Sequence, residues 1–308
     1  METVVDQDVV VDGVRIAYRD GEGDGPPVVL VHGTPSHSYI WRDVIPPLER
    51  DTSVAAQARI LERMLDFWGV EQADIVGHDI GGATAMIFTV NRPERVGKLL
   101  LIDTVSYDSW PSETWQKIIR DHLHQYHRMT LEEFRQMMVR QLTMTVCRKE
   151  HMSKEVLEAY LAPLAGEIGK ASFFTHQVNH YDSRYTEEIT EDLRYLTMPV
   201  KILWGAEDEW QPVSYAKKLA TDIPGADLGI IQEAGHFLME DAPEVVVTEV
   251  RDFLYKSYAR PAGFKPATGG LELRGESLQY VPGCCRTRLI KLNPSKRCCS
   301  LLRVVATG

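Results

Sequence analysis

Four short segments carry residue types that together could break a bond at an electrophilic carbon. They are Gly77-His78-Asp79-Ile80-Gly81-Gly82, Ala234-Gly235-His236, Gly205-Ala206-Glu207-Asp208 and His32-Gly33-Thr34-Pro35. A carboxylate such as Asp79 can attack carbon, an imidazole such as His236 can activate water, and a second carboxylate can hold the imidazole in one tautomer. The sequence therefore predicts a hydrolytic site with Asp79 as nucleophile and His236 as general base.

The segment around Asp79 is typical of a sharp turn between a strand and a helix. ADIVGHD has the continuous apolar character of a buried strand, and GGATAMIFTVNRP follows it as a predicted helix. Glycines suit such a turn because backbone segments pass closely there, and N–H groups at the start of the following helix stabilise negative charge. Because Gly-x-Asp-x-Gly also occurs in ordinary turns, the prediction depends on the other three segments lying nearby.

Two aspartates could orient the imidazole of His236. Asp208 is favoured because a Gly-x-x-Asp loop directly after the predicted strand VKILWG is typical of a functional site. The alternative is Asp103, which follows the strand KLLLID; its structural interpretation is a cap for the turn that comes next.

The pattern around these residues predicts an α/β fold with a helical insertion. Apolar runs such as PPVVLVHG, ADIVGHD, KLLLIDT, VKILWG and LGIIQEAG alternate with helical segments, as a parallel sheet requires. Residues 109–196 carry only helical signals, including a capping box from Thr130 to Glu133. We therefore expect a core from residues 1–108 and 197–259, a helical insertion at 109–196, and a basic, poorly ordered tail at 260–308.

Composition excludes several classes of protein. The net charge of -10 argues against nucleic-acid binding, which needs clustered Lys and Arg. No apolar run is long enough to span a membrane, and the acidic N-terminus is unlike a secretory signal. We expect a cytoplasmic protein, a monomer or homodimer, whose partner is a small-molecule substrate.

The cysteines do not indicate a metal site. Four of the five form adjacent pairs in the tail, namely Cys284-Cys285 and Cys298-Cys299, and adjacent pairs do not match the C-x-x-C spacing of zinc sites. We expect reduced thiols, no metal and no cofactor.

Residues 8–258 resemble the α/β-hydrolase superfamily, in particular its haloalkane dehalogenase and epoxide hydrolase branch with Asp at the nucleophile position. The stretch from His32 to Arg42, HGTPSHSYIWR, is most similar to the dehalogenase version. The resemblance implies a mostly parallel central sheet flanked by helices, with residues 109–196 as a cap over the active site. It also implies an alkyl ester on Asp79, hydrolysed by water that His236 activates, with the backbone N–H groups of Ile80 and Thr34 holding the oxyanion.

The residues that hold the leaving group in this branch are not at their usual positions. Ile80 and Thr34 replace the side-chain N–H donors that dehalogenases have after the nucleophile and after His-Gly. A dehalogenase would therefore need other donors, and Trp110 or Trp115 could serve, although packing in the cap is the structural alternative. An epoxide hydrolase would need cap tyrosines, for which the candidates are Tyr126, Tyr160, Tyr181, Tyr185 and Tyr195.

The chain also lacks a strand and a loop that relatives have near residues 50–52, which indicates an internal deletion. The expected consequence is one missing strand and unpaired backbone groups beside the third strand, unless the second and third strands close the gap. A catalytically impaired family member is therefore an alternative to an active hydrolase. A Ser-type esterase is disfavoured because no Gly-x-Ser-x-Gly occurs in the chain.

Overall fold

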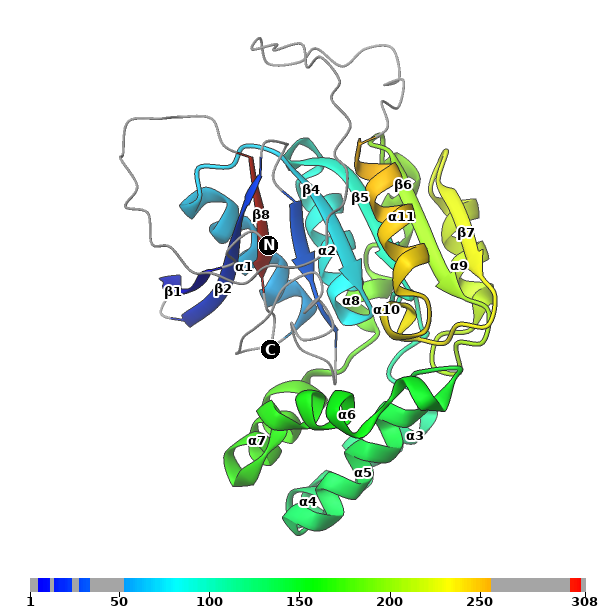
Figure 1. Cartoon of the computed structure of the whole chain (residues 1–308). Coiled ribbons are helices and arrows are strands. Elements are labelled where there is room, and N and C mark those ends of the chain that lie inside the picture. The colour runs from blue at the N-terminus through cyan, green and yellow to red at the C-terminus, as the bar shows by residue number, and fades with distance from the viewer. Residues whose placement is uncertain (1–4, 12–13, 24–27, 34–52, 256–299, 306–308) are drawn as a thin grey trace, which may run out of the picture.

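The computed structural model describes residues 5–11, 14–23, 28–33, 53–255 and 300–305 (Figure 1). Its strands are β1 (Val5–Val11), β2 (Val14–Gly23), β3 (Val28–Val31), β4 (Ala73–His78), β5 (Val96–Ile102), β6 (Val200–Gly205), β7 (Asp227–Ile231) and β8 (Ser300–Val305). The core helices are α1 (Val54–Phe67), α2 (Ile80–Asn91), α9 (Val213–Asp222), α10 (Leu238–Asp241) and α11 (Pro243–Tyr255). The inserted region holds α3 (Glu113–Lys117), α4 (Leu123–His127), α5 (Leu131–Met144), α6 (Lys154–Leu161), α7 (Gly166–Ser172) and α8 (Arg184–Glu187), joined by short 3-10 and π-helical turns.

The strands form one eight-stranded sheet in the order β1-β2-β8-β3-β4-β5-β6-β7. β1 and β2 form an antiparallel hairpin, whereas β3 to β7 run parallel, with Val28 opposite Asp74 and Leu99 opposite Val200. The predicted α/β alternation is therefore confirmed. Neighbouring parallel strands require a crossover connection, and the helices α1, α2 and α9 provide such connections.

The C-terminal segment corrects two expectations. Ser300–Val305, which the sequence assigns to a poorly ordered tail, is the strand β8. It runs antiparallel to β2, where Tyr18 is opposite Val305, and parallel to β3, where Val31 is opposite Val305. The expected gap between β2 and β3 is thus filled, and the backbone of β3 has ladder partners on both sides.

Two apolar layers cover the faces of the sheet. Alternate residues along a strand point to opposite faces, so Leu99 and Leu101 pack in one core with α1, α2 and α9, while Leu100 and Ile102 pack in another with α11 and the inserted helices. The inserted helices lie beyond the carboxyl ends of the parallel strands (Figure 1). Every described regular element between residues 109 and 196 is helical, as the sequence predicts.

Local sequence signals agree with the observed ends of two helices. The Thr130 side chain and the Glu133 side chain complete the predicted capping box at the start of α5. After α1, Gly69 has a φ of 66°, the left-handed conformation that favours glycine at a helix end. No helix in the described segments combines the length and hydropathy needed to cross a membrane.

Candidate active site

Asp79 lies at a strained turn between β4 and α2. Its φ of 52° is rare for a residue with a side chain. The turn is held by its carbonyl oxygen, which accepts hydrogen bonds from the backbone N–H of Gly82 at 2.9 Å and from the hydroxyl of Thr104 at 3.1 Å. The carboxylate is thereby held at the carboxyl edge of the sheet, beside the N-terminus of α2.

Close packing explains the glycines around this turn. A Cβ atom on Gly77 would lie 2.7 Å from the carbonyl oxygen of Gly81, and one on Gly33 would lie 2.3 Å from the Oδ2 atom of Asp79. The loop after β3 therefore passes directly beside the carboxylate. The backbone N–H of Ile80 begins α2 at this point, whereas Thr34, the other expected oxyanion donor, lies outside the described residues.

His236 and Asp208 complete a buried chain of three side chains. The Nδ1 atom of His236 lies 2.9 Å from the Oδ2 atom of Asp208, and its Nε2 atom lies 3.6 Å from the Oδ1 atom of Asp79. The Oδ1 atom of Asp208 accepts from the backbone N–H groups of Trp210 and Gln211 at 2.7 and 2.9 Å. The three side chains are placed as an attacking carboxylate, an imidazole and its orienting acid would be.

Asp103 lies next to this chain without bonding to the imidazole. It is fully buried, and its Oδ1 atom accepts from the backbone N–H of Gly205 at 2.8 Å. Burial, together with the charge of Asp208, raises the pKa of the Asp103 carboxyl well above its usual range. Of the two aspartates that could orient His236, the structure brings Asp208 to the ring.

The charges around His236 shift its pKa in the opposite direction to burial. Burial alone would lower the pKa of the imidazole, but the charges of Asp208 and Asp79 and the Asp208 hydrogen bond raise it well above 6.5. Two nearby imidazoles behave differently, since burial lowers the pKa of both His32 and His78 to about 4. His236 is thus the imidazole of this site whose affinity for a proton is increased by its neighbours, whereas His32 and His78 are uncharged at neutral pH.

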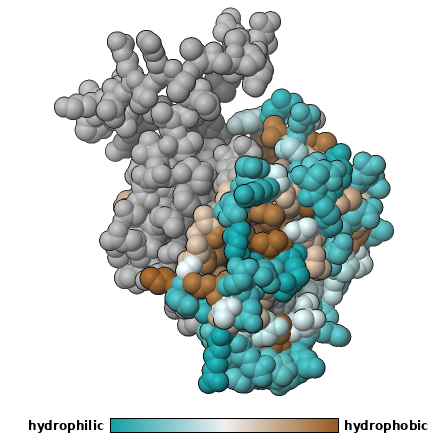
Figure 2. All heavy atoms as spheres, turned by 60° about the horizontal axis from the view of Figure 1, so that its bottom comes forward, coloured by the Kyte–Doolittle hydropathy of each residue, from teal (hydrophilic) through white to brown (hydrophobic). Residues whose placement is uncertain are grey.

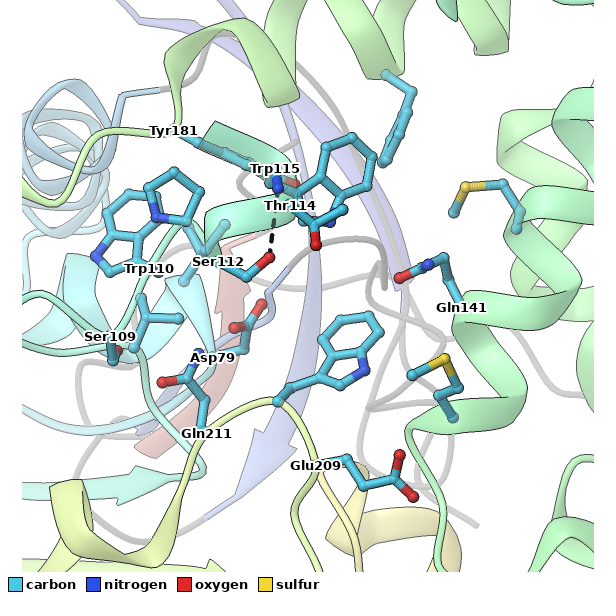
Figure 3. A pocket seen from close by; sticks show the side chains of 17 residues that line it. Asp79, Ser109, Trp110, Ser112, Thr114, Trp115, Gln141, Tyr181, Glu209 and Gln211 are labelled. Atoms are coloured by element: carbon cyan, nitrogen blue, oxygen red, sulfur yellow. Dashed lines mark hydrogen bonds between the residues drawn. The ribbon is translucent and has the colours of Figure 1, made fainter. Parts of the chain in front are cut away.

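A cavity of about 280 Å³ opens above Asp79, between the sheet edge and the cap (Figure 3). Its wall comes from the start of the cap, from α5 and from the loop after β6; the residues are Asp79, Ile80, Val105, Ser109, Trp110, Pro111, Ser112, Thr114, Trp115, Met138, Gln141, Met144, Phe173, Tyr181, Glu209, Trp210 and Gln211. On the cap side of the molecule, a strip of hydrophobic surface runs between hydrophilic flanks (Figure 2). Such a cavity suits a small, mainly apolar molecule with a few polar contacts.

Comparison with known proteins identifies the family. The model of the alpha/beta hydrolase fold family matches residues 51–243. This chain is an α/β hydrolase. The hydrolase is 26% identical to Haloalkane dehalogenase 2 of Mycobacterium bovis, over 77% of this chain and 90% of that protein. It is 24% identical to a cis-3-alkyl-4-alkyloxetan-2-one decarboxylase of Shewanella oneidensis, over 86% of this chain and 93% of the relative.

A solved structure of an alpha/beta hydrolase fold protein from Burkholderia ambifaria is also similar to this hydrolase. The two chains are 26% identical and superpose with a TM-score of 0.72. The match covers 82% of this chain and all of the other. The predicted fold class is therefore confirmed.

The predicted cap donors are placed in different surroundings. Trp110 and Trp115 line the cavity, but the indole N–H of Trp110 donates to the Thr186 hydroxyl at 2.8 Å. Among the tyrosines, Tyr181 lines the cavity, whereas the buried Tyr160 donates its hydroxyl to Glu240 at 2.6 Å. The other three have packing or surface positions: Tyr126 packs on Trp115 and Phe174, Tyr185 lies under the Arg184 guanidinium, and Tyr195 is exposed.

Partners in the fold thus occupy the indole N–H of Trp110 and the hydroxyl of Tyr160, two of the candidate donors. Two other residues of the site were missed by sequence reasoning. The Trp210 ring stacks on His236, with centroids 5.1 Å apart and an interplanar angle of 28°, and Gln211 lies beside Asp79 in the cavity wall. The available signal was their position, directly after Asp208 in a site loop.

No group of three metal-ligating side chains comes together within the described ranges. Asp79, His236 and Asp208 are instead paired with one another through the contacts given above. The four tail cysteines lie outside the described residues.

Proposed function

We propose that this hydrolase cleaves a carbon–halogen bond of a small organic substrate through an alkyl ester on Asp79. The observation that carries the proposal is the carboxylate at the strained turn, pointing into an apolar cavity 3.6 Å from an imidazole that Asp208 orients. A carboxylate nucleophile suits an electrophilic sp³ carbon, because one displacement gives an ester and releases the leaving group.

The first step needs no base. An oxygen of Asp79 forms a bond to the substrate carbon, and the carbon–halogen bond breaks with its electron pair leaving on the halide. The reaction leaves Asp79 as an uncharged ester. The apolar part of the wall, which includes Ile80, Val105 and Phe173, excludes water from the carbon under attack.

In the second step, His236 removes a proton from a water molecule that attacks the ester carbonyl of Asp79. Because the charge of Asp79 contributes to the raised pKa of His236, forming the ester removes one of the causes of that shift. The imidazole therefore gives up its proton more readily in the intermediate than in the resting enzyme. We expect the backbone N–H of Ile80, the first residue of α2, to stabilise the oxyanion, and collapse of this species releases an alcohol and regenerates Asp79.

The alternative is an epoxide hydrolase, which would open an epoxide ring through the same ester on Asp79. Tyr181 favours it, because this tyrosine lines the cavity and its hydroxyl could protonate an opening oxygen. Carbon–halogen cleavage is preferred here because the other candidate tyrosines are absent from the cavity wall. The strand β8 argues against an impaired enzyme, since it gives β3 a partner on the side where a strand was expected to be missing.

The proposal is tested by trapping the ester. A His236→Gln variant is incubated with haloalkanes, with epoxides and with an oxetan-2-one, and the peptide containing Asp79 is analysed by mass spectrometry. We expect an adduct with haloalkanes, none when Asp79 is also replaced by Asn, and halide release by the wild-type protein. An adduct with epoxides alone would support the alternative, and no adduct with any probe would refute both.

A further inference from the structure

We propose that Asp241 is a positioning residue for ester hydrolysis, because its buried carboxylate fixes the loop of His236 to the cap. This inference rests on the proposed function, since it takes His236 as the base that acts on the ester of Asp79. Asp241 is the last residue of α10, the short helix that follows the base. It is not one of the residues that line the cavity, so its effect on the reaction passes through His236.

The carboxylate of Asp241 joins two segments that are far apart in the sequence. Its Oδ2 atom accepts from the backbone N–H of Gly235, one residue before the base, at 2.8 Å. The same atom accepts from the N–H of Cys147 at 2.6 Å, and its Oδ1 atom accepts from the N–H of Arg148 at 3.2 Å. Residues 147 and 148 follow α5, which lines part of the cavity. The base loop and one cavity wall therefore share a single charged acceptor.

A direct backbone contact lies beside this link. The N–H of Phe237, one residue after the base, donates to the carbonyl oxygen of Thr145 at 2.8 Å. A Cβ atom on Gly235 would lie 2.8 Å from the same oxygen, so the two segments pack without room for a side chain. The residues on both sides of His236 are thus held against the turn that ends α5.

The loop that carries His236 requires such support. It begins at Glu233, whose φ of 54° is rare for a residue with a side chain, and a strained backbone persists only where surrounding contacts hold it. The imidazole must also stay within reach of Asp208 and Asp79. Since a misplacement of about 1 Å can cost about 10²-fold in rate, the position of this loop matters for the chemistry.

The link should act on ester hydrolysis and leave ester formation unchanged. Asp79 attacks carbon without a base, and its turn is held by the N–H of Gly82 and the hydroxyl of Thr104. Ester hydrolysis instead needs a water molecule placed between the Nε2 atom of His236 and the ester carbonyl. A shift of the base loop therefore slows the second step alone.

The informative variant is Asp241→Asn. Each oxygen of the carboxylate accepts from a backbone N–H, so an amide, with one oxygen and one NH₂ group, turns its NH₂ group toward an N–H donor on one side. Glu240→Gln is the matched control, because Glu240 lies in the same helix and also accepts from the cap, through the Tyr160 hydroxyl at 2.6 Å. Both variants lose one negative charge, but Asp241→Asn disturbs the acceptor shared with the His236 loop.

The test is a single turnover of the full-length protein with 1-bromobutane. Bromide release reports ester formation, butanol release reports ester hydrolysis, and mass spectrometry follows the adduct on Asp79. For Asp241→Asn, butanol release should slow roughly 10- to 100-fold while bromide release stays within about twofold, so that the adduct accumulates. Glu240→Gln should leave both rates within about twofold of wild type.

An unchanged rate of butanol release in Asp241→Asn would overturn the inference, and so would an equal decrease of both rates, which indicates only a loss of stability. If Asp241→Asn lacks a cooperative unfolding transition in urea, Asp241→Glu replaces it and is judged by the same ratio of rates, because it keeps both acceptor oxygens but displaces the loop. No adduct in any variant, including His236→Gln, would refute the proposed function and this inference together. An adduct that is hydrolysed equally fast in wild type and Asp241→Asn would leave the function standing and refute this inference alone.

Discussion

Removing β8 should unfold the central sheet, because this strand lies between two others. Ser300–Val305 pairs with six residues of β2 and with four residues of β3. A ladder of this size contains on the order of ten backbone hydrogen bonds, each worth about 0.5–1.5 kcal/mol net. Their loss amounts to about 5–15 kcal/mol, which equals the whole free energy of unfolding of a typical domain.

A chain that ends at residue 299 should therefore lack a cooperative unfolding transition in urea, followed by circular dichroism. A finer variant is Val304→Pro, which removes one ladder N–H from a strand with partners on both sides and should lower the free energy of unfolding by about 1–3 kcal/mol. An unchanged midpoint and slope for the shortened chain would refute the placement of β8.

Three further predictions concern the site. Asp208→Asn should slow hydrolysis of the ester by about 10³–10⁴-fold, so that the Asp79 adduct accumulates in a time course followed by mass spectrometry; a steady-state rate within tenfold of wild type would contradict the assigned role. Gly33→Ala should abolish adduct formation, because its Cβ would collide with the Oδ2 atom of Asp79, and normal trapping in this variant would exclude that contact. His78→Gln should make the free energy of unfolding depend less on pH in acid. The pKa of His78 is about 4 in the folded protein, so below pH 6.5 the unfolded chain binds a proton that the folded protein does not. The free energy of unfolding of the wild-type protein therefore falls as the pH decreases toward 4. Between pH 6.5 and 5 the free energy of unfolding of the wild-type protein, measured in urea, should fall by about 1.6 kcal/mol more than that of this variant; equal decreases would contradict the lowered pKa.

Much of the core could be predicted because its signals are local. The strand before Asp79 and the helix after it show their apolar pattern within a few residues, and the capping box of α5 spans only four. The order of the motifs along the chain then indicated the family. These features depend on local sequence, which is why they agree with the structure.

The structure differs from the sequence-based expectations where a strand or a hydrogen bond depends on partners far away in the sequence. β8 is short, and the reason it forms a strand is the open backbone of β2 and β3, which precede it by more than half the chain. The indole of Trp110 and the hydroxyl of Tyr160 find Thr186 and Glu240 only through the packing of the cap. No periodicity within the insertion could have revealed these pairs.

The buried groups around the site determine how strongly a change at Asp79 acts on His236. Burial raises the pKa of Asp103 and lowers that of His78 to about 4, and the carboxylates in contact with the imidazole are those of Asp79 and Asp208. In a buried site, where screening by solvent is weak, losing the charge of one of these two contacting carboxylates has a large effect on the proton affinity of His236. Burial disfavours the charged form of Asp103, so Asp103 adds less to the proton affinity of His236 than an exposed carboxylate would, and the charge of Asp79 keeps a larger share of the control over that affinity.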